Sequence, residues 1–337
     1  WRWPEARREP VVFDLEGEVV GGSLMLIQRL PLGLGALAVA KWGPMQARLD
    51  RPDAMAVYAG MIEALIEEYA VKRRMFLSVL PWATLSERHA EYEYLMRRGF
   101  QPGSRLLFPN RYVVNLRLSD AEQRQSFEQK WRYHLKKSEA AGLSFERAGP
   151  ERLGEFDALY EQLLDRKKFA DHSAYDTVAD LMAIPNETLR PELFFVRHAG
   201  RVVGGAVIFK AGARAVYLYG ATTPEALALR AGYYLHWQII RWLRDNTRAL
   251  WYDLGGTDGF HGLHQFKKGM AGSAGVISPI PRVAYYAAHP APFLLGRAAF
   301  AARDLLHHAL RLIDRLRADR AKPDQPPHVE RDPRSGR

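Results

Sequence analysis

The sequence predicts an α/β protein with mixed sheets, built from two similar units in tandem. The chain has 337 residues, 47% of them apolar, which is more than one hydrophobic core usually organises. Each half repeats the order strand meander, helix, short strand, helix, strand. The second helix of each half ends in similar sequences, residues 95–100 (LMRRGF) and 265–270 (QFKKGM). We therefore predict an internal duplication in which these paired-basic helix ends superimpose.

The first predicted unit covers residues 1–142. Strands are predicted where apolar and polar residues alternate, and helices where apolar residues recur at helical spacing. A linker helix over residues 120–142 begins at a capping box formed by Ser119 and Glu122. Because the sequence begins at Trp1 without a methionine, we expect this unit to lack its natural N-terminus. The other predicted strands are 11–15, 21–29, 36–41, 75–80 and 111–118, and the other helices are 53–73 and 86–98, the latter ended by Gly99.

The second predicted unit covers residues 143–288. A basic amphipathic helix is predicted over residues 289–321, where leucines recur at helical spacing between arginines. This helix either docks on the protein or lies on an anionic bilayer. Residues 322–337 are rich in proline and charge, which predicts a disordered tail. The strands of the second unit are predicted at 143–147, 193–196, 202–209, 215–220, 250–254 and 275–286, and its helices at 151–168, 175–184, 229–244 and a short segment ending at Gly269.

Composition restricts the kind of site and the compartment. The chain has no cysteine, which excludes disulfides, thiolate nucleophiles and zinc-thiolate sites. Its 48 basic and 38 acidic side chains give a net charge of +10, which favours nucleic acid, phosphorylated nucleotides or an anionic membrane surface as partners. The sequence has no long uncharged apolar run and no leader, so we expect a cytoplasmic protein. Peripheral contact with the inner face of the plasma membrane is a further expectation.

The common catalytic motifs are absent from the sequence. It has no P-loop, no G-x-S-x-G elbow, no H-E-x-x-H helix and no kinase signature. Covalent nucleophilic catalysis therefore has no candidate residue. His261 and His264 are spaced i,i+3, but no third ligand is nearby, so we favour a loop or capping role and predict no metal site.

Six segments, in order and at compatible spacing, carry a resemblance to a known family. They are residues 40–44 (AKWGP), 131–142 (WRYHLKKSEAAG), 217–222 (YLYGAT), 230–237 (RAGYYLHW), 251–256 (WYDLGG) and 262–269 (GLHQFKKG). Together they resemble the motifs of the Fem (FemABX) peptidoglycan-bridge aminoacyltransferases, relatives of the GNAT acetyltransferases. The resemblance covers most of residues 11–285. It implies two GNAT-like domains in tandem, in agreement with the duplication read from the sequence.

The resemblance also implies a reaction. An amine on the stem peptide of a UDP-linked or lipid-linked muropeptide would attack the ester of an aminoacyl-tRNA, with no cofactor and no covalent enzyme intermediate. An activated ester needs positioning and stabilisation of the oxyanion more than a nucleophilic side chain. The lack of a cysteine or a catalytic triad is therefore compatible with this chemistry.

The motif matches assign roles to four residues. Lys41 and Arg230 are expected to grip the pyrophosphate of the precursor; the alternatives are an exposed strand-end charge and a helix-surface salt bridge. Lys267 is expected near the acyl carbonyl or the tRNA terminus, the alternative being a cation at the C-terminal end of a helix. Asp253 is either a general base or substrate contact or a turn former, and we favour the turn.

Further residues are weaker candidates. Tyr219 and Tyr234 are placed to hydrogen-bond the substrate, although tyrosines at such spacings usually pack half-buried. The sequence departs from the family at residues 108–111 (FPNR), where relatives often carry an acidic residue that contacts the substrate. Candidates for binding tRNA are Arg132, Lys136, Lys137 and Lys268.

Three other functions compete with this interpretation. An acyl-CoA-dependent GNAT N-acyltransferase would share the fold, but Tyr233 and Tyr234 stand where a CoA-binding loop needs bare backbone. A non-catalytic RNA-binding protein would explain the charge and the aromatic, basic segment 131–137. A membrane-associated scaffold would use the C-terminal helix.

Overall fold

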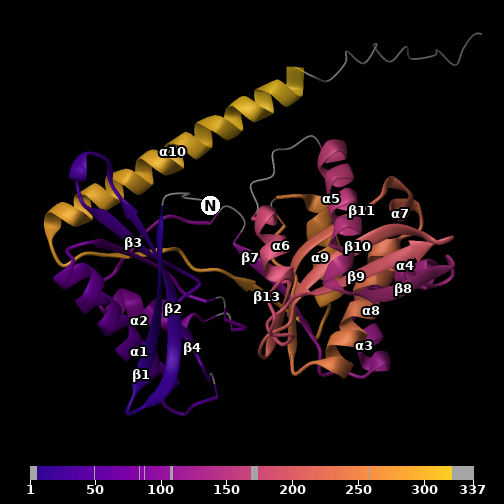
Figure 1. The fold of residues 1–337 in the computed structure, drawn as a ribbon, viewed down its shortest axis with the longest axis horizontal. Helices are drawn as coiled ribbons and strands as arrows, with labels where there is room; N and C mark the ends of the chain where they lie inside the picture. The colour runs from indigo at the N-terminus through magenta and orange to yellow at the C-terminus, as the bar shows by residue number, and fades with distance from the viewer. Residues whose placement is uncertain are drawn as a thin grey trace, which may run out of the picture.

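A computed structural model gives the fold (Figure 1). It describes residues 6–48, 50–82, 84–86, 88–106, 109–167, 174–257 and 259–320, with side chains left out at 167, 307, 308 and 310–320. Two seven-stranded mixed sheets, each covered by helices, form two units, which we call the first and second unit after the half of the chain that supplies most of each. The predicted fold class is confirmed. The predicted tail at 322–337 lies outside the described residues.

The first unit has the strand order β1-β2-β3-β5-β14-β6, with β4 paired to β2. Strands β1, β2 and β3 form the predicted antiparallel meander, and β3 and β5 are parallel because α1 connects them. The elements are β1 (Arg7–Leu15), β2 (Glu18–Arg29), β3 (Ala36–Lys41), β4 (Met45–Gln46), α1 (Ala54–Leu65), a π-helical continuation (Ile66–Lys72), β5 (Phe76–Leu80), α2 (Ala90–Arg97) and β6 (Gln101–Pro102).

The second unit has the strand order β13-β7-β12-β11-β10-β9-β8. Its meander runs from β8 to β11, and β11 is parallel to β12 because α8 connects them. The elements are β7 (Asn110–Asn115), α3 (Asp120–Ser126), α4 (Gln129–Glu139), β8 (Leu143–Ala148), α5 (Leu153–Lys167), α6 (Val178–Met182), β9 (Glu192–His198), β10 (Arg201–Phe209), β11 (Arg214–Thr222), α7 (Pro224–Ala228), α8 (Ala231–Asn246), β12 (Trp251–Asp253), α9 (His261–Ala271) and β13 (Val276–Pro279).

Each sheet is completed by a strand from the other half of the chain. After β6, the chain crosses over and supplies β7 to the second sheet, between β12 and β13. After β13, it crosses back and supplies β14 (Ala284–Tyr286) to the first sheet, between β5 and β6. The crossing segments bond to each other: Ile280 N donates to Pro109 O at 2.7 Å and Val283 N to Ser104 O at 3.0 Å. Neither sheet is complete without this exchange.

The exchange confirms the duplication and corrects two details of it. The pairs β3/β11, β5/β12, α2/α9, β6/β13 and β7/β14 occupy equivalent places in the two sheets. However, α2 ends at Arg97, before Gly99 with φ 100°, whereas α9 continues past Gly269 to Ala271 and ends at Gly272. The paired-basic sequences are therefore not equivalent helix ends. The unit boundaries at 142 and 288 also need correction, because β7 lies in the second sheet and β14 in the first.

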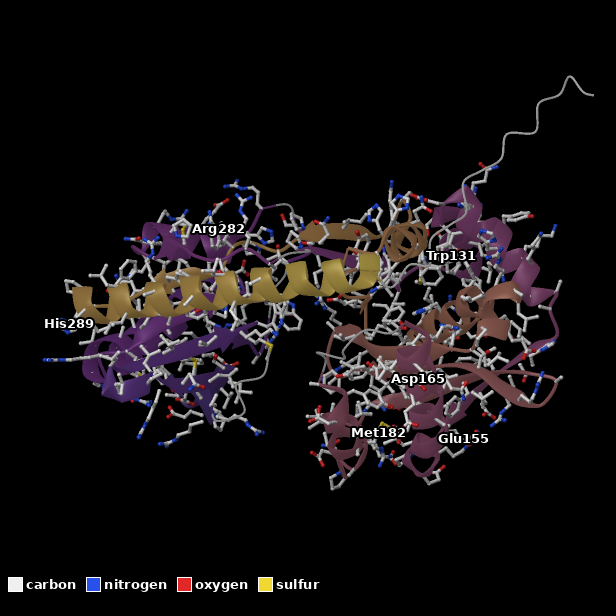
Figure 2. The ribbon with its side chains drawn as sticks, turned by 90° about the horizontal axis from the view of Figure 1, so that it is seen from above. Trp131, Glu155, Asp165, Met182, Arg282 and His289 are labelled. Atoms are coloured by element: carbon white, nitrogen blue, oxygen red, sulfur yellow. The ribbon has the colours of Figure 1, made fainter. Side chains whose placement is uncertain are left out.

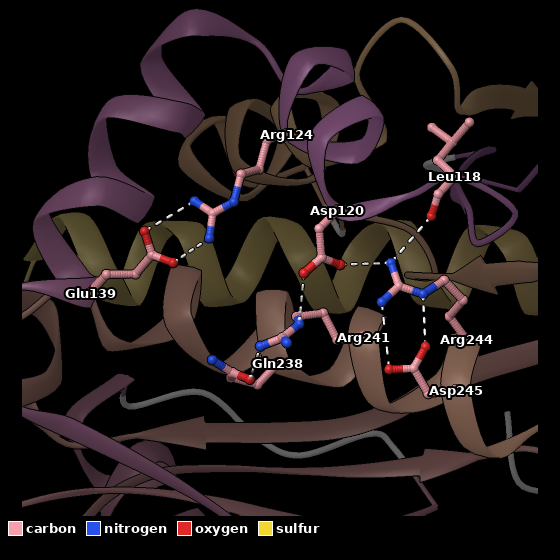
Figure 3. Close-up of polar contacts among 8 residues, drawn as sticks. All are labelled: Leu118, Asp120, Arg124, Glu139, Gln238, Arg241, Arg244 and Asp245. Carbon is pink, nitrogen blue, oxygen red and sulfur yellow. Dashed lines mark hydrogen bonds and ion pairs between the residues drawn. The ribbon is translucent and has the colours of Figure 1, made fainter.

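The predicted linker helix is two helices, both packed on the second unit. The capping box starts α3 as predicted, with Ser119 Oγ accepting from Glu122 N, but the extended Phe127 separates α3 from α4. Phe127 and Trp131 are buried in the core of the second unit. Polar contacts anchor α3 on α8 (Figure 3): Asp120 accepts from Arg241 at 3.0 Å and from Arg244 at 2.7 Å.

The C-terminal helix α10 (Pro290–Arg320) returns to the first unit. Phe293 and Phe300 pack on Phe76 of β5, and Gly296 allows the close approach because a Cβ there would lie 2.1 Å from the Phe76 ring. Figures 1 and 2 show α10 running along the first unit from His289 toward the side of the second. In the described part of the chain, no helix is long and apolar enough to cross a bilayer.

Candidate active site

Two arginines meet one buried carboxylate where the two units face each other, and a lysine lies close to one of these arginines. Arg111 of β7 clamps Asp253 at the end of β12: its Nε lies 3.1 Å from both carboxylate oxygens and its Nη2 lies 2.8 Å from Oδ2. Arg214, at the start of β11, lies 3.9 Å from Oδ2. Lys41, at the end of β3, keeps an exposed side chain, but neighbouring protein atoms remove part of its hydration. This lost hydration, and secondly the charge of Arg111, lowers the pKa of Lys41. We call these four residues the junction cluster.

Two tryptophans complete the junction cluster's surroundings. Trp42 follows β3 and Trp82 follows β5, and because these strands are parallel neighbours, both rings reach the same edge of the first sheet. The Arg111 guanidinium lies 5.5 Å from the Trp42 ring centre and that of Arg214 lies 5.2 Å from the Trp82 ring centre. The two rings meet edge to face at 6.4 Å. The three cations and one carboxylate give this surface a net charge of +2, and two tryptophan rings border it. Such a surface suits a ligand in which a phosphate group adjoins a ring.

Strand β11 is open on one side beyond the junction cluster. Within the described part of the chain, it pairs with β12 as far as Val216, and from Tyr217 onward it pairs with β10 alone. A bulge at Leu218 shifts the register between Tyr217 and Tyr219. As a result, Tyr217 packs on the α8 side of the sheet and Tyr219 on the α5 side, against Tyr160 and Tyr175.

Lys267 lies at the base of this opening. Its side chain is buried, with 6% of its surface exposed, and its Nζ donates to Leu254 O at 2.6 Å and Gly256 O at 2.5 Å. The ammonium also lies 5.8 Å from the centre of the Tyr217 ring. Lys267 therefore holds the loop that follows β12, and its expected role near an acyl carbonyl stays a prediction.

A buried histidine lies close to Lys267. His236 of α8 contacts Tyr252 through Nδ1 and Oη at 3.1 Å, and its ring lies 5.0 Å from that of Tyr217. Burial, together with the charge of Lys267, lowers the pKa of His236 to about 3. His236 is therefore neutral at physiological pH and packs beneath Tyr217 and Tyr252 in the core of the second unit.

A cavity of about 560 Å³ lies between α4, α8 and α9. Basic side chains and aromatic rings dominate its wall, where Glu128 is the acidic residue. Two buried polar atoms in the wall, Trp131 Nε1 and His134 Nδ1, have no hydrogen-bond partner within the described part of the chain. We call this the helix cavity. It is lined by Glu128, Lys130, Trp131, His134, Arg230, Tyr233, His261, Gly262, His264, Gln265, Phe266, Lys268 and Gly269.

The joint phosphate-binding role of Lys41 and Arg230 stays a prediction, and the two residues belong to different features of the structure. Lys41 belongs to the junction cluster, whereas Arg230 precedes α8 in a left-handed conformation (φ 56°) and lines the helix cavity. The reason is the length of β11, which begins at Arg214 and spans roughly 26 Å before the chain turns through α7 to Arg230. Arg111 is the cation whose charge acts on Lys41, and Arg214 joins the junction cluster through Asp253.

The other predicted residues have the following places. Asp253 takes the favoured turn role, since its Oδ1 also accepts from Gly255 N at 2.9 Å. Tyr219 and Tyr234 are partly buried against the core on opposite faces of the second sheet. Of the tRNA candidates, Lys268 lines the helix cavity and lies 3.7 Å from Glu128. Arg132 donates to the carbonyls of Gln125 and Phe127, Lys137 lies over the Tyr133 ring, and Lys136 is exposed.

Sequence reasoning missed three residues of this region. Arg111 was noted only as part of a departure from the family motif, and nothing at Arg214 or Trp82 signalled a site. Their meeting depends on the strand exchange, which brings β7 next to β12. His264 was weighed as a metal ligand and a loop or capping role was favoured; the described residues contain no group of three or more potential metal ligands.

Comparisons with known proteins agree with this architecture. The model of the FemAB family matches residues 12–177, and the model of the acetyltransferase (GNAT) domain matches residues 125–268. These two matches, together with the FemX structure described below, support a Fem-family, GNAT-like protein. Its two GNAT-like units make it a transferase of the acyltransferase type, as the resemblance implied. No curated protein sequence is significantly similar to it.

Solved structures share the fold of this Fem-family chain. FemX superimposes with a TM-score of 0.67 at 17% identity, over 84% of this chain and 88% of FemX. The C-terminal domain of a putative lysylphosphatidylglycerol synthetase from Agrobacterium fabrum gives 0.50 at 14% identity, over 82% and 85% of the two chains. L-PGS from Bacillus licheniformis gives 0.50 at 14%, over 85% of both. The alignments extend over both units.

Proposed function

We propose that this Fem-family protein transfers an amino acid from an aminoacyl-tRNA to an amine of a phosphate-bearing peptidoglycan precursor. The junction cluster carries the proposal. It presents three cations on rigid strand ends from both units, and fixed guanidinium and ammonium donors suit the oxygens of a diphosphate. The family's peptidoglycan link, through the FemAB model and FemX, supports a muropeptide precursor as the acceptor.

The acceptor would lie in the junction between the units. Its diphosphate would contact Lys41 and Arg214, while Arg111 stays engaged with Asp253. The ring faces of Trp42 and Trp82 would pack against the adjoining nucleoside, sugar or lipid portion. A contact of this charged kind contributes about 1.5–3 kcal/mol, or roughly 10- to 150-fold in affinity.

The donor would enter the helix cavity. Lys130, Arg230 and Lys268 supply positive charge for phosphodiester oxygens, and Tyr233 and Phe266 offer rings on which an unpaired base stacks. The unpartnered Trp131 Nε1–H is a further donor in the wall. Charge and stacking together favour a single-stranded nucleotide end.

The reaction itself would be direct aminolysis of the donor ester. The open side of β11 gives the acyl group a place between the two binding regions, with buried Lys267 beneath it. The ammonium of Lys267 and the backbone amides of the loop after β12 would stabilise the negative charge that develops on the carbonyl oxygen. The protein then contributes positioning and electrostatics, without a covalent intermediate.

A transfer assay tests this function. The chain is incubated with charged tRNA or with acyl-CoA, each with a UDP-linked muropeptide, and products are analysed by mass spectrometry. The proposal predicts a gain of one amino-acid residue that requires charged tRNA and is abolished by ribonuclease. Transfer from acyl-CoA alone would favour the competing N-acyltransferase function, which the GNAT-domain match supports.

We also propose that α10 brings the protein to an anionic bilayer. Phe293, Gly296 and Phe300 form the docked face of α10, whereas Leu294 and Leu305 lie on a different face and are 67% and 72% exposed. Docking and membrane contact therefore use different sides of one helix. The arginines in the helix suit anionic head groups, and this location would place the protein near lipid-linked precursor.

A further inference from the structure

His264 stands in a wall shared by two cavities. One is the helix cavity of about 560 Å³, and the other is a smaller cavity of about 290 Å³ next to β7. Because His264 lines both, its imidazole can touch molecules that enter from either side. The smaller cavity is lined by Pro109, Asn110, Tyr112, Thr257, Gly259, Phe260, His261 and His264.

Tyr112 fixes the orientation of this imidazole. Tyr112 Oη and His264 Nδ1 are 2.5 Å apart, and the two rings meet edge to face at 5.6 Å. Tyr112 is 1% exposed and is held in β7, and Thr257 and Asn110 also hydrogen-bond to its phenol. The Nε2 atom of His264 has no partner within the described part of the chain. One ring nitrogen is therefore anchored and the other is available to a ligand.

The carboxylates of this region are poor candidates for a base. Both oxygens of Asp253 are engaged by Arg111, and Oδ1 also accepts from Gly255 N, so this carboxylate is already occupied. Glu128, the acidic residue of the helix cavity wall, lies 3.7 Å from the Lys268 ammonium. Imidazole is a common general base near neutral pH, which leaves His264 as the oriented base that lines both cavities.

We propose that His264 is the proton carrier of the transfer reaction and that Tyr112 is its positioning residue. This inference rests on the proposed function. In the step, the neutral acceptor amine attacks the ester carbonyl, the C–N bond forms, and Nε2 takes the proton from the new C–N nitrogen. The C–O ester bond then breaks, and the imidazolium returns this proton to the leaving ribose oxygen. Nδ1–H donates to Tyr112 Oη throughout, and no further reactant is consumed.

Other charged and titratable groups face the same space and share in its pH response. His261 is nearest, with its ring centre 6.5 Å from that of His264. Further charged and titratable groups line the helix cavity. They are Glu128, Lys130, His134, Arg230 and Lys268. Tyr112 contacts the Nδ1 side of the His264 ring.

Rate measurements against pH test the role. His264→Gln should lower kcat by on the order of 10²- to 10⁴-fold. It should also remove the acid limb of the pH–rate profile, which is the fall in rate at low pH that protonation of an essential base produces. Added imidazole should restore part of the activity of His264→Ala. His261→Gln is the matched control, since it changes a histidine of the same wall without a tyrosine anchor, and it should keep the acid limb. Tyr112→Phe should keep the limb but lower kcat, because the ring loses its anchor.

A readout independent of activity is the tautomer of His264, measured by ¹⁵N NMR and assigned by loss of its signals in His264→Gln. The proposal requires a protonated Nδ1 and a bare Nε2; a proton on Nε2, with Nδ1 accepting from Tyr112, would overturn it. An active His264→Gln enzyme that keeps its acid limb overturns it too, while the proposed function stands. A wild-type chain that transfers nothing overturns the proposed function as well, so the two failures are distinguishable.

Discussion

The buried His236 makes a quantitative prediction for stability against pH. Its pKa is lowered to about 3 in the folded protein, first by burial and second by the Lys267 charge, whereas an ordinary histidine titrates near 6.5. Above pH 6.5 the imidazole is neutral in both states and contributes no pH dependence. Below pH 6.5, this histidine binds a proton in the unfolded chain but stays neutral in the folded chain. The free energy of unfolding therefore falls by about 1.4 kcal/mol per pH unit until pH approaches 3.

Replacing His236 with asparagine removes this proton linkage. The asparagine keeps a polar group near Tyr252 Oη, which His236 contacts at 3.1 Å. Between pH 7.5 and pH 5, the free energy of unfolding of the wild type should fall by about 2 kcal/mol more than that of His236→Asn. The measurement is urea unfolding followed by circular dichroism at each pH. The exposed His289 supplies the control, since His289→Asn should follow the wild type. Equal falls in wild type and His236→Asn would refute the reasoning.

Three further predictions follow from the site and the C-terminal helix. Lys41→Met and Arg214→Met should each raise the KM of a UDP-linked acceptor roughly 10- to 150-fold with little change in kcat. The control is Lys72→Met, at an exposed position, which should match the wild type in steady-state kinetics. An unchanged KM in both Lys41→Met and Arg214→Met would show that these two residues do not bind the acceptor. Lys267→Met leaves two backbone carbonyls without their donor and should lower the unfolding free energy by about 2–4 kcal/mol in urea titration, and a neutral result would show that the loop finds other partners. A stop after Asp304 keeps the docked part of α10 and should abolish salt-sensitive sedimentation with anionic vesicles; retained sedimentation would place the membrane contact elsewhere.

Much of the fold was accessible from sequence because local signals agreed with it. Alternation located the meander strands, and helical spacing located α1 and α8. The Ser119 capping box located the start of α3 to the residue. The boundary errors have local causes: Phe127 is extended and interrupts the predicted linker helix, and α9 continues past Gly269 to Ala271 and ends at Gly272, whose φ is 59°.

The reciprocal strands were not accessible, because pairing partners are a long-range property. Residues 110–115 and 284–286 read as ordinary strands, and nothing in their sequence states which sheet they join. The candidate site has the same limit. Lys41 was found from a motif, but Arg111 beside it and Arg214 beside Asp253 come from separate strands that only the exchange brings together. Arg230 was paired with Lys41 by resemblance, and the course of β11 separates them.

The roles of individual residues depended on burial, which the sequence states poorly. Lys267 was expected at the reaction centre or at a helix end, and it lies buried under the loop after β12. Tyr219 and Tyr234 were weighed as packing residues, and their partial burial agrees with that alternative. His264 gained a partner that no spacing rule predicts, since Tyr112 is 152 positions away.

The central claim is that acyl transfer uses an acceptor whose phosphates bind the junction cluster. The most direct measurement compares kcat/KM for transfer from charged tRNA to a UDP-linked muropeptide and to the same muropeptide without its diphosphate, in the wild type and in Arg214→Met. The account predicts that the wild type prefers the phosphate-bearing acceptor by about 10-fold or more and that Arg214→Met loses most of this preference. Equal kcat/KM for the two acceptors in the wild type would contradict it.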